Sequence, residues 1–241
     1  MLTPIIHPNL SVVISEREDG NQAESLETQP SATVNRMRLY KKTKLDPNQI
    51  TVMRVMHGNE YQQVSKVLST SPLAVDALIT DRPGTTLGLL TADCIPLIFF
   101  CPETQSLALV HLGWKNNDIY FAQTIVKALH QTYQVDPKNL VAYLGPAILG
   151  TSYRYQTDSV RERFDQKWLP YLTDQVDGFT RVDNVSFCFD QLLRSGLLEE
   201  NINLSGIDTG SDQRFYSHHQ STHHHEPAGR FITLVTISRS D

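Results

Sequence analysis

The pattern of hydrophobic and polar positions predicts a chain that mixes strands with helices. The densest apolar region holds three runs, at residues 87–91, 95–100 and 107–111. Their near-continuous apolar character is typical of strands buried on both faces. The short loop at 101–106 between the last two runs predicts a hairpin. This region is therefore expected to form the centre of the fold.

Further strands are predicted at residues 10–15, 50–56, 73–80, 140–144, 202–207 and 231–237, and helices at 31–42, 119–129, 159–168 and 187–196. Strands and helices do not alternate in a strict βαβ rhythm. This order favours an α+β fold, in which mixed β-sheets are flanked by helices. We predict a single layered domain over residues 1–241, with a mobile polar loop at 16–30.

Composition and charge narrow the classes of function. The chain has 241 residues, of which 40% are hydrophobic and 20% charged, and a net charge of −5. No basic stripe stands out, so nucleic acid is not an expected partner. No apolar run reaches the roughly 20 residues that span a bilayer, so a membrane is not expected either. The three cysteines and the lack of an export signal predict reduced thiols and a cytoplasmic location.

Three side chains that bind transition metals follow predicted strands or end them. These are His57, Cys94 and His111. Thiolate sulfur and imidazole nitrogen are the donors that zinc prefers, and three protein ligands leave a fourth position for water or substrate. A lone cysteine between apolar strands is also commonly a small buried hydrophobe, and no CxxC or HExxH motif is present. From spacing alone, both interpretations stay open.

A resemblance to a known family favours the metal site. Residues 91–96 (TADCIP), 110–115 (VHLGWK) and 144–148 (LGPAI) resemble, in this order, the TADC-x-P, H-A-G-W-R-G and GP-x-I motifs of the YfiH-like laccase-domain family. His57-Gly58 resembles the end of the upstream Q-V-H-G element of that family. Asn35-Arg36 and Gly229-Arg230 resemble its N-R and G-R pairs.

The resemblance implies an activity and a cofactor. In that family the matched His57, Cys94 and His111 bind zinc, with copper as the alternative metal, and serve catalysis. Members phosphorolyse adenosine, inosine, guanosine and methylthioadenosine and deaminate adenosine, and they have also been called polyphenol oxidases or laccases. The implied partners are small purine nucleosides and phosphate, and Lys115 is expected to supply charge to the phosphate. Arg36 is a further candidate for substrate binding, with a surface arginine on an exposed helix face as the equal alternative. The implied fold is similar to the catalytic domain of cytotoxic necrotizing factor.

The chain departs from the family pattern at several positions. Lys115-Asn116 stands where the family has Arg-Gly, so the bidentate guanidinium fork is lost. Residues 153–155 (YRY) replace Tyr-Glu-Val, and Asp208-Thr209 replaces Cys-Thr. His218-His219 replaces Tyr-Arg at the end of a Phe-Phe-Ser-Tyr-Arg motif. Metal ligation thus carries over better than phosphate recognition.

Other residues have competing interpretations. Asp93 precedes Cys94, and strand alternation would turn it to the opposite face, which favours a structural hydrogen bond over a role as a base. The histidine-rich stretch at 218–225 could bind a second metal, but we favour a solvated loop. Trp114 is expected to pack beside the site, and the alternative is that its indole stacks on a base.

Two classes of enzyme and one non-enzyme class remain. A zinc-dependent nucleoside enzyme uses Cys94 as a ligand, whereas a cysteine hydrolase uses it as a nucleophile with His111 as its base. A zinc-bound thiolate is not free to attack, so the two exclude each other. A metal-binding protein without catalysis is the third interpretation.

Overall fold

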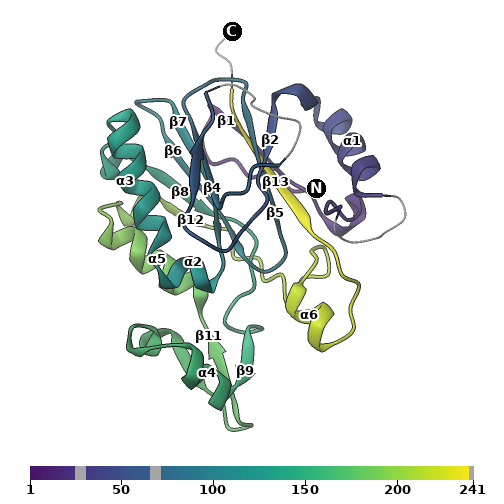
Figure 1. Ribbon diagram of the computed structural model, residues 1–241, viewed down its shortest axis with the longest axis vertical. Coiled ribbons are helices and arrows are strands. Elements are labelled where there is room, and N and C mark those ends of the chain that lie inside the picture. Colours follow the sequence, from purple (N-terminus) through teal and green to yellow (C-terminus); the bar gives the residue numbers. More distant parts are fainter. Residues whose placement is uncertain (25–30, 66–71, 239–241) are drawn as a thin grey trace.

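The computed structural model describes residues 1–24, 31–65 and 72–238, and it places two β-sheets face to face between layers of helices (Figure 1). The larger sheet has the order β12-β8-β6-β7-β4-β3 and the smaller one β1-β13-β5-β2. The larger sheet comprises β3 (Tyr61–Gln63), β4 (Ala77–Thr80), β6 (Ile95–Cys101), β7 (Ser106–Leu112), β8 (Val141–Leu144) and β12 (Ile202–Leu204). The smaller one comprises β1 (Leu10–Ile14), β2 (Ile50–Val52), β5 (Thr86–Thr91) and β13 (Phe231–Ile237). The α+β fold with mixed sheets is thus confirmed.

The central strands are buried on both faces, as their apolar runs predict. In β6, Leu97 and Phe99 face the helices, whereas Ile98 and Phe100 face the smaller sheet. This division follows from the alternation of side chains along a strand. The same alternation in β13 sends residues to the space between the sheets and to the outer face of the smaller sheet. The two stacked sheets are called the sandwich below.

Helices cover both outer faces of the sandwich. Helices α3 (Phe121–Tyr133) and α5 (Asn184–Arg194) pack on the larger sheet, and α1 (Ala32–Thr43) packs on the smaller one (Figure 1). All three were predicted near these bounds. Helix α3 buries the face that carries Ile125, Val126 and Leu129, because these positions recur at helical spacing.

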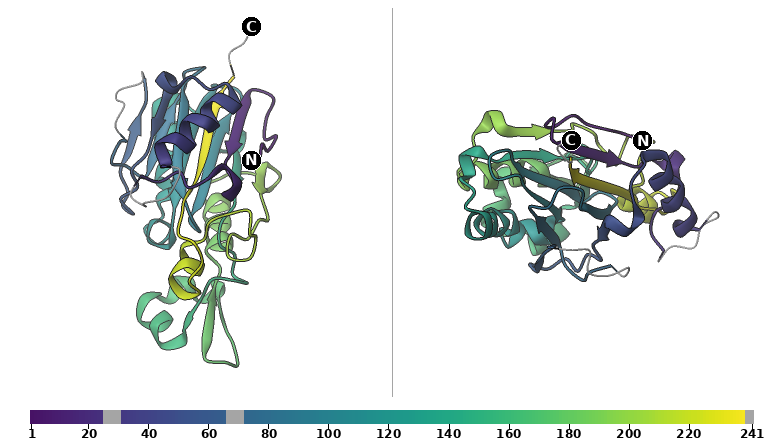
Figure 2. Two further views of the ribbon diagram at one scale, coloured as in Figure 1. Left: turned by 90° about the vertical axis from the view of Figure 1, so that its right-hand side faces the viewer. Right: turned by 90° about the horizontal axis from the view of Figure 1, so that it is seen from above.

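A small three-stranded sheet extends from one end of the sandwich (Figure 2). Its strands are β9 (Arg154–Gln156), β10 (Leu172–Asp174) and β11 (Phe179–Val182), and none was predicted, because they are short and partly polar. The helix predicted at 159–168 is wrong in its second half. Helix α4 (Thr157–Arg163) stops before Phe164, whose backbone is extended, and a 3-10 helix follows at Gln166–Tyr171. The break lets both Phe164 and Trp168 enter one aromatic cluster.

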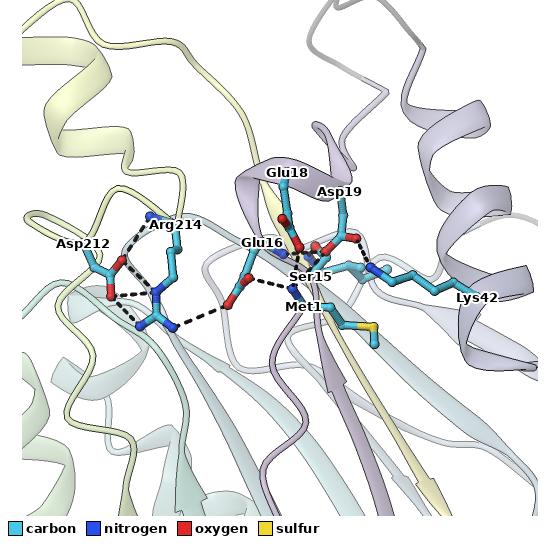
Figure 3. A network of polar contacts seen from close by, with 9 residues as sticks. Met1, Ser15, Glu16, Glu18, Asp19, Lys42, Asp212 and Arg214 are labelled. Atoms are coloured by element: carbon cyan, nitrogen blue, oxygen red, sulfur yellow. Dashed lines mark hydrogen bonds and ion pairs between the residues drawn. The ribbon is translucent and has the colours of Figure 1, made fainter.

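Part of the polar segment expected as a mobile loop has polar contacts. A 3-10 turn at Arg17–Asp19 lies within it, and residues 25–30 are outside the described ranges. The Glu16 carboxylate accepts a hydrogen bond from the Met1 ammonium group at 2.6 Å, and Asp19 forms an ion pair with Lys42 of α1 at 3.1 Å (Figure 3). This network joins the turn to α1. The mobility of the whole segment stays a prediction.

Two further features bear on the expected class. Across the described residues, none of the helices combines the length and the apolar character needed to cross a membrane. Cys94, Cys101 and Cys188 are free thiols, and the last two are fully buried in the core between the larger sheet and its helices.

Because the central strands are buried on both faces, truncating one of their large side chains should lower the free energy of unfolding considerably. Phe99→Ala should lower the free energy of unfolding by about 3–5 kcal/mol, because Phe99 is fully buried between the larger sheet and α3. Val176→Ala, at a fully exposed position, should change it by less than about 0.5 kcal/mol. Urea unfolding of both metal-free variants measures the difference. Equal midpoints would contradict this account of the core.

Candidate metal centre

The structure brings together the three side chains predicted as ligands. His57 follows β2, Cys94 lies in the turn between β5 and β6, and His111 is the penultimate residue of β7. Their candidate ligand atoms all lie within 4.8 Å of one another. The rings of His57 and His111 have centres 4.8 Å apart and are nearly perpendicular. One imidazole pair and one thiol thus face a common point, as a mononuclear zinc or copper site requires.

The turn that carries Cys94 passes from one sheet to the other, because β5 belongs to the smaller sheet and β6 to the larger one. Asp93 lies in this turn with φ of 83°, in the left-handed region. It is not on a strand, so the argument from strand alternation does not apply. Its carboxylate accepts hydrogen bonds from Thr209 Oγ1 at 2.8 Å and from the His219 backbone N–H at 2.6 Å. Asp93 therefore anchors two later segments beside Cys94.

A buried carboxylate organises the other two ligands. Asp76, directly before β4, is fully buried. One of its oxygens lies 2.8 Å from His111 Nδ1, which fixes the ring and leaves Nε2 for a metal. The same carboxylate accepts the backbone N–H groups of His57 at 3.0 Å and Gly58 at 2.8 Å. These bonds hold His57 at a left-handed φ of 56°.

A close approach of the backbone completes the centre. A Cβ atom on Gly113 would lie 3.1 Å from Cys94 Sγ and 3.6 Å from His57 Nδ1, so a side chain there would crowd the ligands. Helix α2 (Trp114–Asp118) begins at this point. Its buried Asn116 donates to the Gly58 carbonyl at 2.7 Å and accepts the Gly113 N–H at 3.1 Å. The donor set and this cradle fit a metal ion.

The pKa values of the two histidines shift in opposite directions. Burial lowers the pKa of His111, but the negative charges of Cys94 and Asp76 outweigh it and raise that pKa to about 9. Burial and the neighbouring His111 lower the pKa of His57. Burial opposes ionisation of Asp76, yet hydrogen bonds from His111 and Gly58 hold its pKa below the ordinary value. Without a metal, His111 therefore carries a proton that the metal must displace.

The three ligands open into a pocket of about 370 Å³. The predicted residues Lys115 and Trp114 line it, Lys115 exposed and Trp114 half-buried. Arg230 also lines it, and Cys94 and Asp93 are near enough to interact electrostatically with its guanidinium. Arg36 is not among the lining residues, because it lies on α1 and pairs with Glu24. Its predicted contact with substrate has no support in this geometry and stays a prediction.

The histidine-rich stretch at 218–225 is the solvated loop that we favoured only in part: four of its five histidines are exposed, but most of it is helical and one histidine is buried. Residues 218–223 form helix α6 (His218–His223), whose N-cap Ser217 accepts the Gln220 N–H. His219 is buried, and it lines the same pocket together with His218 and His223. Burial and the neighbouring histidines lower its pKa to about 4, so it is neutral at pH 7.

Sequence reasoning missed Asp76 and the place of Arg230 in the pocket. Asp76 is the one acidic residue in the apolar run 73–80, and a charge inside such a run signals a paired, buried group. Arg230 stands out in the sequence only as part of the Gly229-Arg230 motif. Its partners lie more than 130 residues away in the sequence, and no local pattern identifies them.

Together, fold and site define an α+β protein with an open three-ligand cluster able to hold a metal ion. Residues 20–238 match the family described as multi-copper polyphenol oxidoreductase laccase, and the chain belongs to this family. The resemblance seen in the sequence motifs is thus confirmed.

Relatives and solved structures agree with this assignment. A protein of Xylella fastidiosa strain 9a5c named purine nucleoside phosphorylase is 30% identical over 211 residues, which cover 84% of this chain and 77% of the relative. Purine nucleoside phosphorylase YlmD of Bacillus subtilis strain 168 is 29% identical over 201 residues, covering 76% and 69%.

Two crystal structures share the fold. They are the hypothetical protein YfiH of Bacillus licheniformis, with a TM-score of 0.81, and YlmD of Geobacillus stearothermophilus, with a TM-score of 0.82. Each is 20% identical and covers 98% of this chain, while the alignment spans 99% and 94% of the two structures.

Asp76→Asn should weaken zinc binding by about 10–100-fold, because the amide cannot hold both the His111 ring and the backbone at 57–58. Asp177→Asn, at an exposed carboxylate on the β10–β11 hairpin, is the matched control and should leave affinity unchanged. Competition with a chromophoric chelator measures both. Equal affinities would contradict the organising role of Asp76.

Zinc binding should release at least one proton at pH 7, and its affinity should rise with pH up to about 9. The reason is that His111, with its pKa raised to about 9, must give up the proton on the nitrogen that binds the ion. Calorimetric titration in two buffers with different ionisation enthalpies measures the release. A binding enthalpy that is the same in both buffers would count against it.

Proposed function

We propose that this chain is a zinc-dependent purine nucleoside phosphorylase that acts on adenosine, inosine, guanosine and methylthioadenosine and also deaminates adenosine. Copper is the alternative metal. The proposal extends to a cytoplasmic enzyme with small nucleosides and phosphate as partners. Its support is the family, the names of the relatives, and a pocket where three metal donors face two cationic side chains.

The observation that carries the proposal is the pair of cations beside the three ligands. Phosphate is a dianion that needs fixed positive charge and several donors. Arg230, half-buried, offers a planar fork, and Lys115 offers a point charge at the exposed end of the pocket. Arg230 thus keeps one guanidinium fork in the pocket, although the fork at position 115 is lost.

These residues fit the demands of phosphorolysis. A phosphate oxygen forms a bond to the ribose C1′, the bond from C1′ to the purine N9 breaks, and the purine leaves with its bonding electrons. Arg230 and Lys115 would orient the phosphate for this attack. Trp114 lines the pocket wall, where its ring would contact the nucleoside. A zinc ion held by His57, Cys94 and His111 would supply Lewis acidity and would lower the pKa of a bound water molecule, which is the chemistry that deamination needs.

A cysteine hydrolase is the second candidate, and one geometric observation favours it. Asp76, His111 and Cys94 form a chain in which the carboxylate orients the imidazole and the imidazole lies beside the sulfur. This is the arrangement of a catalytic triad, with Cys94 as the nucleophile, His111 as the base and Asp76 as the acid that orients the base. Metal occupancy separates the two candidates, because a ligated thiolate cannot act as the nucleophile.

The test is to incubate the zinc-loaded protein with each nucleoside, with and without phosphate, and to separate the products. Lys115→Ala should lower phosphorolysis by about 10-fold or more and leave deamination nearly unchanged, because only the phosphate needs that charge. His57→Ala should abolish both activities. Lys127→Ala, at an exposed lysine of α3 outside the pocket, is the control for loss of charge.

Other outcomes decide between the candidates. If no nucleoside is converted above the His57→Ala background, the proposal fails. If alkylation of Cys94 in metal-free protein blocks an amidase activity, the cysteine hydrolase is correct. Oxidation of phenols by a copper-loaded protein identifies a polyphenol oxidase. A protein that binds metal and converts none of these substrates is a metal-binding protein.

A further inference from the structure

Two histidines of α6 form a second pair of imidazoles beside the pocket. His219 and His223 lie four residues apart, so they share one face of the helix. Their ring centres are 4.6 Å apart, close to the 4.8 Å that separates the rings of His57 and His111. A helical pair of histidines at this spacing is a recurrent way to bind one metal ion.

The pair is held in place by its surroundings. The His219 backbone N–H donates to Asp93, the residue next to the ligand Cys94. Its ring makes edge contacts with Tyr153 at 5.9 Å and Tyr155 at 5.7 Å between centroids. Because these contacts already fix the His219 side chain, it loses little conformational entropy when it binds a ligand. His223 is exposed, so an ion can reach the pair from solvent.

We propose that His219 and His223 bind a second divalent transition-metal ion, on the wall of the same pocket that the three-ligand cluster opens into. Two imidazoles leave the remaining coordination positions for water or for anionic oxygens.

The ion would add positive charge where the sequence departs from its family. His219 stands at the position of an arginine in the Phe-Phe-Ser-Tyr-Arg motif. The nearby Arg154 does not replace that charge in the pocket, because it pairs with Asp177 at 2.5 Å. A metal ion on α6 supplies a cation there by different chemistry. The binding of this ion does not depend on the nucleoside reaction proposed above.

Titration of metal-free protein with Co²⁺ tests the site, because the two ions differ in their spectra. A Co²⁺ ion bound by Cys94 gives a sulfur-to-metal charge-transfer band, whereas an ion held by two imidazoles gives only d–d bands. The wild-type protein should bind two Co²⁺ ions per chain, with the charge-transfer band saturating after one. Cys94→Ser should lose that band and keep the second ion.

His223→Asn should weaken binding of the second Co²⁺ ion by about 10-fold or more, because chelation by two linked ligands is lost, and it should leave the charge-transfer band intact. His225→Asn is the matched control: His225 is also exposed and belongs to the same stretch, but it does not line the pocket. It should bind two ions as the wild type does.

Two results would overturn the proposal. One is a wild-type protein that binds a single Co²⁺ ion. The other is an equal loss in His223→Asn and His225→Asn, which would show diffuse binding to a histidine-rich segment without a built site.

Discussion

The ionised carboxylate of Asp76 is the interaction on which the centre depends. It is fully buried, and it lies within hydrogen-bonding distance of the His111 ring and of three successive backbone N–H groups at residues 56–58. A buried charge is costly unless such partners surround it. Each partner is also a part of the site that must be positioned. The same bonds that stabilise the carboxylate therefore set the backbone of His57 and the ring of His111.

The double-layered sheet explains why these groups meet at one end of the molecule. The chain leaves β5 in the smaller sheet and enters β6 in the larger one through the turn that holds Cys94. The hairpin of β6 and β7 then returns His111 to the same end, where it pairs with Pro96. Arg230, just before β13, arrives there because β13 is antiparallel to β5. The ligands thus come from distant positions in the sequence and meet at one end of the sandwich.

The sequence allows prediction of the features that depend on local pattern. The apolar runs of β6 and β7 require burial on both faces, and the three ligands carry donor chemistry that stands out from their neighbours. The remaining features depend on tertiary partners. Asp76 is recognisable as unusual, but its bonds to residues 56–58 form only when that loop wraps around it. The strands β9 to β11 lack a strong pattern, and α6 is held by a carboxylate more than 120 residues earlier. A short window of sequence therefore does not reveal these tertiary contacts.

The two candidate chemistries of this site differ in whether Nε2 of His111 carries a proton or binds a metal ion. Asp76 engages Nδ1 of His111, so Nε2 is the atom left to face Cys94 and His57. With a proton on Nε2, the imidazolium stabilises a thiolate at Cys94, which is the state of a cysteine nucleophile. With a metal ion there, the sulfur is a ligand and its lone pair is no longer free to attack. The raised pKa of His111 favours the proton when no metal is present, whereas His57, whose pKa is lowered, offers a neutral nitrogen that only a metal uses. A cysteine nucleophile needs one histidine as its base, so the second imidazole beside Cys94 favours the metal as the natural occupant.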